Sequence, residues 1–153
     1  MTKQSIKVIL GVTLLEIMLV LAIAAMVIVM SVRYYQTATS GEQVNAVLEQ
    51  ISAITAAADG LSQGTASYLV ANISTATLSP ILPANGLTLP WGTTIVVNNA
   101  STSSYNIVLS SVPSNQCPLI TARVTVNSHF SSATACNPAP AVTTITISYT
   151  STT

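Results

Sequence analysis

Charge is the scarcest property of this sequence. Only four Lys or Arg and four Asp or Glu occur in 153 residues, whereas about a quarter of the residues in a soluble domain are charged. Beyond position 10 the cations are Arg33 and Arg123, ninety positions apart. A nucleic-acid-binding protein needs clustered Lys and Arg to displace the counterions of the phosphate backbone. The composition therefore argues against nucleic acid as a partner.

Residue sets for catalysis or metal binding are also lacking. His129 is the only histidine, so one chain has no multi-histidine metal site, and a lone histidine in a polar loop is expected at the surface. The sequence has no glycine-rich phosphate-binding loop. Its many Ser and Thr residues have no plausible base to make them nucleophiles. We expect no enzyme activity and no cofactor.

Cysteine is limited to Cys117 and Cys136, both in the last third of the chain. In a chain with a membrane or export segment, an even pair suggests a disulfide formed in an oxidising compartment. Closing a loop of this length stabilises a fold by about 3 kcal/mol in the chain-entropy model. The alternative is a pair of buried free thiols.

Apolar side chains are abundant near the amino terminus. After the polar start MTKQSIK, the apolar run 8–32 is interrupted at only four positions, namely Gly11, Thr13, Glu16 and Ser31. About twenty residues of helix span the hydrocarbon core of a bilayer. The run continues past the alanines at 22–25, where a signal peptide would end. We therefore expect a membrane helix, and Lys3 and Lys7 before it predict a cytoplasmic amino terminus.

Glu16 is out of place in such a helix. A carboxylate at the centre of a membrane helix costs about 2.5–3.5 kcal/mol on insertion scales. Acidic residues inside membranes usually pair with another group and mark a function. An ordinary single-span anchor leaves Glu16 unexplained.

The stretch GVTLLE, from Gly11 to Glu16, resembles the processing site of type IV pilins and pseudopilins, because basic residues precede it and a long apolar run follows. The resemblance implies that a prepilin peptidase cuts after Gly11, that the new amino terminus at Val12 is methylated, and that 142 residues remain. Glu16 is then the fifth mature residue. In that family the glutamate of one subunit is proposed to meet the α-amine of its neighbour, here Val12. Such a pair would fix the register between subunits.

The helix is expected to continue beyond the membrane. Six apolar residues share one helical face, namely Val44, Val47, Leu48, Ile51, Ile54 and Ala58. This pattern predicts an amphipathic helix packed on a sheet. Gly41 is either a mild bend or a tolerated helix glycine. Asp59-Gly60 is the expected helix stop.

The rest of the chain predicts short strands separated by turns. Residues 82–92 (LPANGLTLPWG) read as loop, and strands are expected at 93–97, 105–110 and 142–149, the first two joined by a wide turn at NNASTSS. Residues 115–127 are ambiguous. Their Val and Thr content favours a strand, whereas a Ser114 cap with Pro118 in the first turn favours a short helix at 115–122. NSHFSSATACNPAPA is expected to be loop, and Trp91 either a packing anchor or a contact to another molecule.

These expectations give an α+β fold, with a long amino-terminal helix packed on a small antiparallel sheet. The predicted parts are a leader at 1–11, a membrane and filament-core helix at 12–40, its amphipathic continuation at 41–60 and a disulfide-bearing head at 61–153. The segments LPWGTTIVV and YNIVLSSVPSNQC are similar to the head of type IVb pilins. A short helix commonly follows the first cysteine in that group, which favours helix at 115–122. Val12, in place of the phenylalanine usual in type IVa pilins, also favours the IVb group.

The resemblance implies a structural subunit stored in the inner membrane and then polymerised into an extracellular filament. Arg33, Tyr34 and Tyr35 suit the outer membrane–water interface of the stored subunit. The implied partners are further copies of the chain, the prepilin peptidase, an assembly ATPase and membrane platform proteins. Two alternatives remain: a pseudopilin of a type II secretion system, and a single-span membrane protein with a periplasmic domain that never polymerises.

Overall fold

A computed structural model describes residues 13–65, 73–132, 136 and 142–151 of the chain. The chain divides into two compact units, residues 1–39 and 40–153, and each is described by itself. Helix α1, Leu14–Thr65, contributes residues to both units. The second unit combines the later part of α1 with a small antiparallel sheet, so the fold is of the predicted α+β class.

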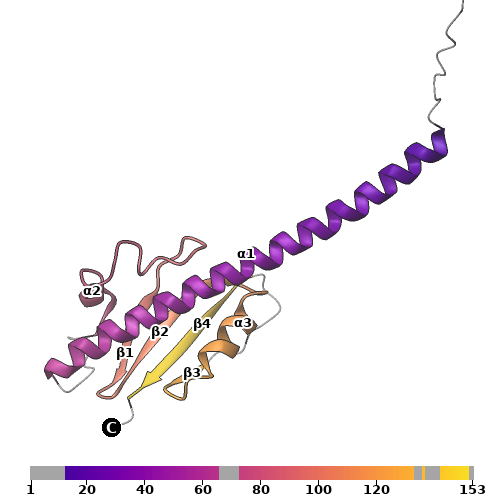
Figure 1. Ribbon diagram of the computed structural model, residues 1–153. Helices are drawn as coiled ribbons and strands as arrows, with labels where there is room; N and C mark the ends of the chain where they lie inside the picture. The colour runs from indigo at the N-terminus through magenta and orange to yellow at the C-terminus, as the bar shows by residue number, and fades with distance from the viewer. Residues whose placement is uncertain (1–12, 66–72, 133–135, 137–141, 152–153) are drawn as a thin grey trace, which may run out of the picture. The chain divides into compact units, whose positions relative to one another are not determined.

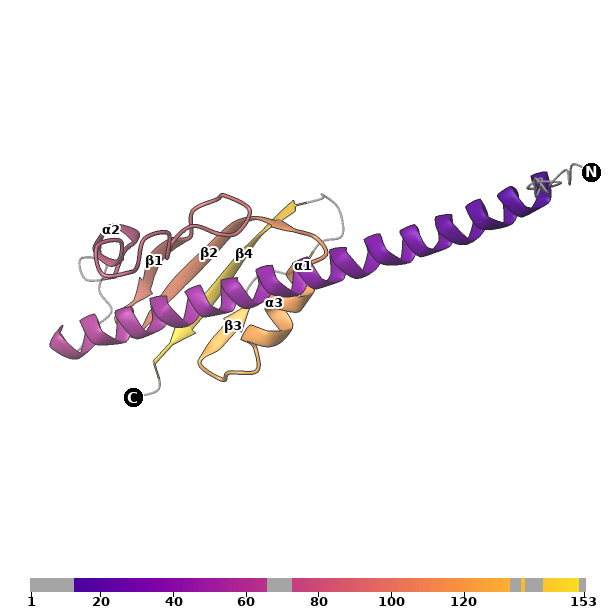
Figure 2. The same cartoon turned by 45° about the horizontal axis from the view of Figure 1, so that its top comes forward.

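The later part of α1 lies along one face of the sheet (Figures 1 and 2). Its buried residues are Val44, Val47, Ile51, Ile54 and Ala58, with Leu48 partly buried beside them. The predicted amphipathic face is therefore confirmed. The stop predicted at Asp59-Gly60 is wrong, because the helix continues to Thr65. Leu61 still packs against the core, and one exposed glycine costs a helix only about 1 kcal/mol.

Four strands form the sheet in the spatial order β1-β2-β4-β3, and every neighbouring pair is antiparallel. The strands are β1 (Val96–Ser101), β2 (Ser104–Pro113), β3 (Phe130–Ser132) and β4 (Val142–Thr150). Along β2 and β4, buried Tyr105, Ile107, Leu109, Ile145 and Ile147 alternate with less buried, mostly polar residues. One face of the sheet thus packs on α1, as expected for a half-buried antiparallel sheet.

The hairpin of β1 and β2 differs from its prediction in where it turns. Asn98 and Asn99 belong to β1 and pair with Asn106 and Tyr105, so only Thr102 and Ser103 form the turn. Backbone pairing across the ladder outweighs the turn preference of asparagine. Upstream, the predicted strand residues at 93–95 bond to the 87–89 segment instead, for example through the Ile95 N–H to the Leu87 carbonyl at 2.7 Å.

The segment predicted as loop around Phe130 contains the edge strand β3, which is a second correction. Phe130 pairs with Tyr149 of β4, and the two rings meet edge to face with centroids 5.2 Å apart. A three-residue strand is stable only because β4 supplies its hydrogen-bond partners. The strand predicted at 142–149 is confirmed as β4.

Two short helices flank the sheet, with α2 (Thr75–Leu78) beside β1 and α3 (Cys117–Val124) beside β3 (Figure 2). For residues 115–127, the helical alternative is confirmed by α3 and the strand alternative is wrong. Pro118 lies in the first turn as expected, but the N-cap is Gln116 rather than Ser114, and it makes no side-chain capping bond. The buried residues of α3 are Cys117, Ile120 and Val124.

Candidate functional site

The first turn of α1 holds the candidate assembly residue Glu16. Thr13 is the N-cap: its hydroxyl accepts the Glu16 N–H at 3.3 Å, and its carbonyl accepts the N–H groups of Glu16 and Ile17 at 3.0 and 3.2 Å. Thr13 and Glu16 have the S/T-x-x-E spacing of a capping box. The sequence signal for this cap was present in GVTLLE but was not part of the prediction. The helix start is thereby defined one residue after Thr13.

The Glu16 side chain is exposed, and no basic side chain of the described residues pairs with it. Glu16 lies in the first turn of α1, where an acidic side chain interacts favourably with the helix dipole. The predicted cleavage residues Gly11 and Val12 lie outside the described residues. The pairing of Glu16 with a neighbouring Val12 amine therefore stays a prediction.

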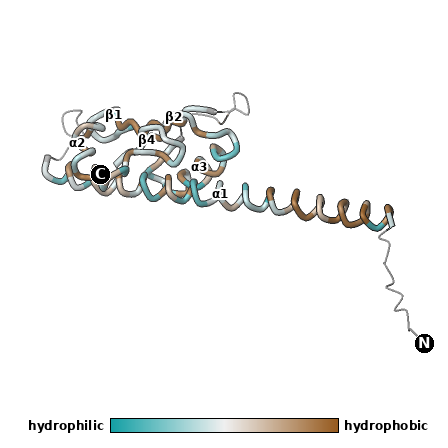
Figure 3. Tube along the Cα trace, turned by 90° about the horizontal axis from the view of Figure 1, so that it is seen from above, coloured by the Kyte–Doolittle hydropathy of each residue, from teal (hydrophilic) through white to brown (hydrophobic). Residues whose placement is uncertain are grey.

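Every residue from 14 to 38 is exposed in a single copy of the chain, and most of this segment is strongly hydrophobic (Figure 3). By length and composition, α1 is apolar and long enough to cross a membrane. The hydroxyls of Ser31, Thr37 and Thr39 donate to carbonyls four residues earlier, at 2.8 to 3.1 Å. This internal bonding lowers the cost of placing hydroxyl groups in an apolar environment.

Cys117 and Cys136 form a disulfide, so the free-thiol alternative is wrong. The bond joins the start of α3 to a residue 19 positions later, with the two Cα atoms 5.8 Å apart. Cys117 is buried in the core and Cys136 packs partly against it. The disulfide thus ties the carboxy-terminal part of the second unit to its core.

Polar contacts join α1 to α3 and the turn before it, and the sequence did not predict them. Gln116, only 3% exposed, donates from its amide to the Gln43 amide oxygen. Asn115 donates to the Ser40 hydroxyl at 3.4 Å. Arg123 donates to the Asn45 amide oxygen. These contacts set how α3 and the disulfide lie along α1.

Trp91 acts as a packing anchor. Its indole N–H donates to the Ser110 carbonyl at 2.9 Å, and its ring packs partly against the core. His129 lies at the surface as expected, half-buried, and its ring stacks on Tyr149 with centroids 5.8 Å apart.

Comparisons with known proteins add nothing to this description: no protein-family model matches the chain, and no curated protein matches it.

Proposed function

We propose that this chain is a structural subunit of a type IV pilus, of the IVb group, cleaved after Gly11 and polymerised through α1. One observation carries the proposal: the sequence GVTLLE leads into an apolar helix that begins at Leu14, and residues 14–38 of this helix are all exposed in a single copy. So large an apolar surface needs lipid or protein around it. A subunit first stored in a membrane and then packed into a filament core gives these residues both environments in turn.

The position of Glu16 supports a role in setting the axial register between neighbouring subunits. Cleavage after Gly11 creates a cation, the Val12 amine, four residues before Glu16. A carboxylate inside an apolar core must be paired to be tolerated. Pairing with the amine of a neighbouring copy would neutralise both groups and select one axial offset between subunits.

The head supports the same function more generally. An α+β unit closed by a disulfide suits a protein exposed outside the cytoplasm. Under this proposal the precursor spans the inner membrane with its amino terminus in the cytoplasm and ends in an extracellular filament. The prepilin peptidase, an assembly ATPase and platform proteins are its processing and assembly partners.

Intact mass and filament yield test the proposal in cells that contain the peptidase and assembly machinery. We expect the chain to lose its first eleven residues and to carry a methyl group on Val12. Glu16→Ala and Glu16→Gln should be cleaved normally but should yield far fewer filaments. Glu42→Gln, which removes another exposed carboxylate of α1, is the matched control and should assemble as the parent does.

Other outcomes would redirect the proposal. An unshortened chain would favour the single-span membrane protein that never polymerises. A deletion that impairs protein secretion without removing surface filaments would favour a pseudopilin. Normal assembly of both Glu16 variants would remove the role of Glu16 in register.

A further inference from the structure

The exposed face of α1 carries two carboxylates with no ion-pair partner among the described residues, although Arg123 reaches Asn45 between them. The exposed residues of this outer face follow helical spacing, at Glu42, Asn45, Glu49, Ser52 and Ala56. No basic side chain of the described residues pairs with Glu42 or Glu49. Seven residues apart, the two carboxylates lie on the same side of the helix.

A hollow of about 340 Å³ lies beside Glu49. Residues of α1 form one wall and the turn at 83–86 forms the other, and the lining is Ala46, Glu49, Gln50, Ala53, Pro83, Ala84, Asn85 and Gly86. The small side chains of Ala46 and Ala53 leave the space open. The Glu49 carboxylate is the one ionic group among these lining residues.

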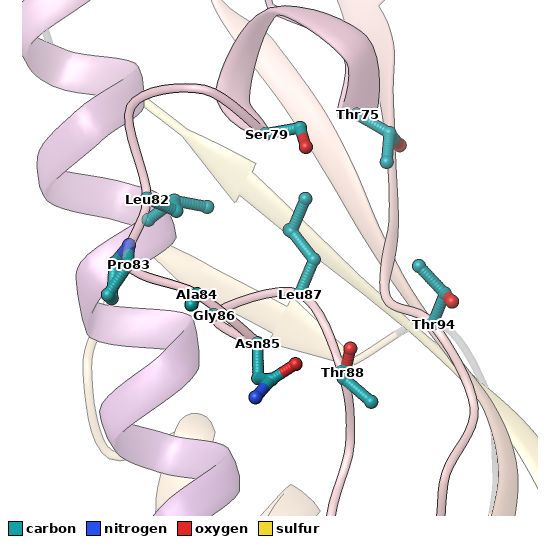
Figure 4. A pocket seen from close by; sticks show the side chains of 10 residues that line it. All are labelled: Thr75, Ser79, Leu82, Pro83, Ala84, Asn85, Gly86, Leu87, Thr88 and Thr94. Atoms are coloured by element: carbon teal, nitrogen blue, oxygen red, sulfur yellow. The ribbon is translucent and has the colours of Figure 1, made fainter.

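The turn that forms the second wall is held firmly against α1. The Gln50 side-chain amide donates to the Asn85 and Thr88 carbonyls, at 3.3 and 2.7 Å. A Cβ at Gly86 would lie 3.0 Å from the Pro83 carbonyl oxygen, so a larger residue would be crowded in this turn. Figure 4 shows this turn in the lining of a neighbouring hollow, which shares Pro83, Ala84, Asn85 and Gly86 with the recess. The recess beside Glu49 is therefore built by fixed elements.

Gln50 also shapes the chemistry of the recess. Both of its amide hydrogens are used by the turn, and its Oε1 is buried without a hydrogen-bond donor in the described part of the chain. The recess thus presents the Glu49 carboxylate beside the Gln50 side chain. This chemistry favours a cationic donor such as a guanidinium.

The mature chain offers few side-chain cations for this recess. Arg33 and Arg123 are the two, and Arg123 donates to Asn45. Arg33 is exposed and has no acidic partner among the described residues. Sixteen positions of α1 separate Arg33 from Glu49, whereas charges on one helix pair three or four positions apart. Arg33 therefore has no carboxylate within reach on its own helix, and a second copy can supply one.

We infer that Arg33 of one copy docks in the recess of a second copy and pairs with Glu49. The inference rests on the proposed polymer and adds a second charge pair to it, distinct from Glu16 and the Val12 amine. Its basis is charge complementarity between the unpaired Arg33 and the unpaired Glu49. A charge buried between copies without its partner would oppose association.

Charge exchange tests this pair in the full chain, in cells with the peptidase and assembly machinery. Arg33→Glu and Glu49→Arg should each lower filament yield by roughly tenfold or more, and the double variant should restore it to within about twofold of the parent. Glu49→Gln, which keeps the size of the side chain, should also lower the yield. Glu42 lies on the same face outside the recess, so Glu42→Arg is the matched control. It should not restore the filament yield that Arg33→Glu loses.

A crosslink gives an independent readout. Arg33→Cys with Glu49→Cys should join copies into covalent ladders in isolated filaments, whereas Arg33→Cys with Glu42→Cys should not. Formation of the Cys117–Cys136 disulfide in each variant serves as the check on folding.

Two results would overturn the inference alone: parent filaments form but Glu49→Arg and Glu49→Gln assemble equally well, or the double variant is no better than the single variants. If the parent chain is neither shortened nor polymerised, the proposed function and this inference both fail.

Discussion

At the residue scale, Trp91 donates a hydrogen bond to β2 at a point where the backbone of the strand is irregular. The pairing of β2 with β4 shifts between Leu109 and Val112, and Ser111 has a positive φ of 57°. The Ser110 carbonyl there accepts two side-chain donors, the Trp91 indole N–H at 2.9 Å and the Thr93 hydroxyl at 2.8 Å. Both donors come from the segment that precedes β1.

A double-mutant cycle measures this shared acceptor. We expect Trp91→Phe and Thr93→Val each to lower the free energy of unfolding by about 1 kcal/mol, because each removes one hydrogen bond. The double variant should lose more than the sum, since the Ser110 carbonyl is then left without either donor. Urea unfolding of the full chain in detergent gives the values.

Thr94→Val is the control for this cycle, because Thr94 is exposed and donates no side-chain bond to Ser110. Its effect should stay within about 0.5 kcal/mol. Strictly additive losses would mean that the two donors do not share the carbonyl in solution.

At the element scale, α3 depends on contacts beyond its own sequence. Its N-cap makes no side-chain bond, and eight residues are too few for a stable isolated helix. The disulfide at its first residue, its buried residues and the polar contacts to α1 hold it in place. The stability of α3 is therefore tertiary in origin.

Removal of the disulfide tests this dependence. Cys117→Ala with Cys136→Ala should lower the free energy of unfolding by about 3 kcal/mol, because the unfolded chain loses the constraint of the closed loop. Denaturant unfolding of the parent under reducing conditions should reproduce the loss. The double variant should not respond to reductant, and an unchanged midpoint of the reduced parent would contradict the prediction.

At the scale of the whole molecule, exposed apolar surface is divided unevenly between the two units. The large exposed hydrophobic side chains of α1 lie at 14–35, whereas those described in the second unit are scattered at Ile81, Val96, Leu119 and Val126. The buried core lies within residues 40–153. The second unit therefore has a buried core of its own. The first unit has an exposed apolar helix that needs lipid or protein around it.

Truncation tests this division. A fragment of residues 40–153 should be monodisperse in aqueous buffer by size-exclusion chromatography and should unfold cooperatively. The full chain should aggregate without detergent or lipid, because its apolar helix has no cover in a single copy. Aggregation of the fragment at low concentration would show that the unit needs residues 1–39 to fold.

Local signals in the sequence were sufficient for several features. The apolar run, the helical face at 44–58 and the strand at 142–149 follow from periodicity that each segment carries by itself. The Cys117–Cys136 pair followed from a count of two cysteines. The resemblance of GVTLLE to a processing site depends on consecutive residues, so the candidate assembly residue Glu16 also needed no structure to be found.

Tertiary structure alone decided the features that depend on a distant partner. Phe130 lies in a strand because β4 is beside it, and Asn98 and Asn99 extend β1 because β2 offers them backbone partners. The recess beside Glu49 exists because Gln50 holds a turn that lies more than thirty residues later in the chain. Periodicity and composition describe what a segment prefers alone, whereas hydrogen bonds and packing between segments are satisfied only after the chain has folded.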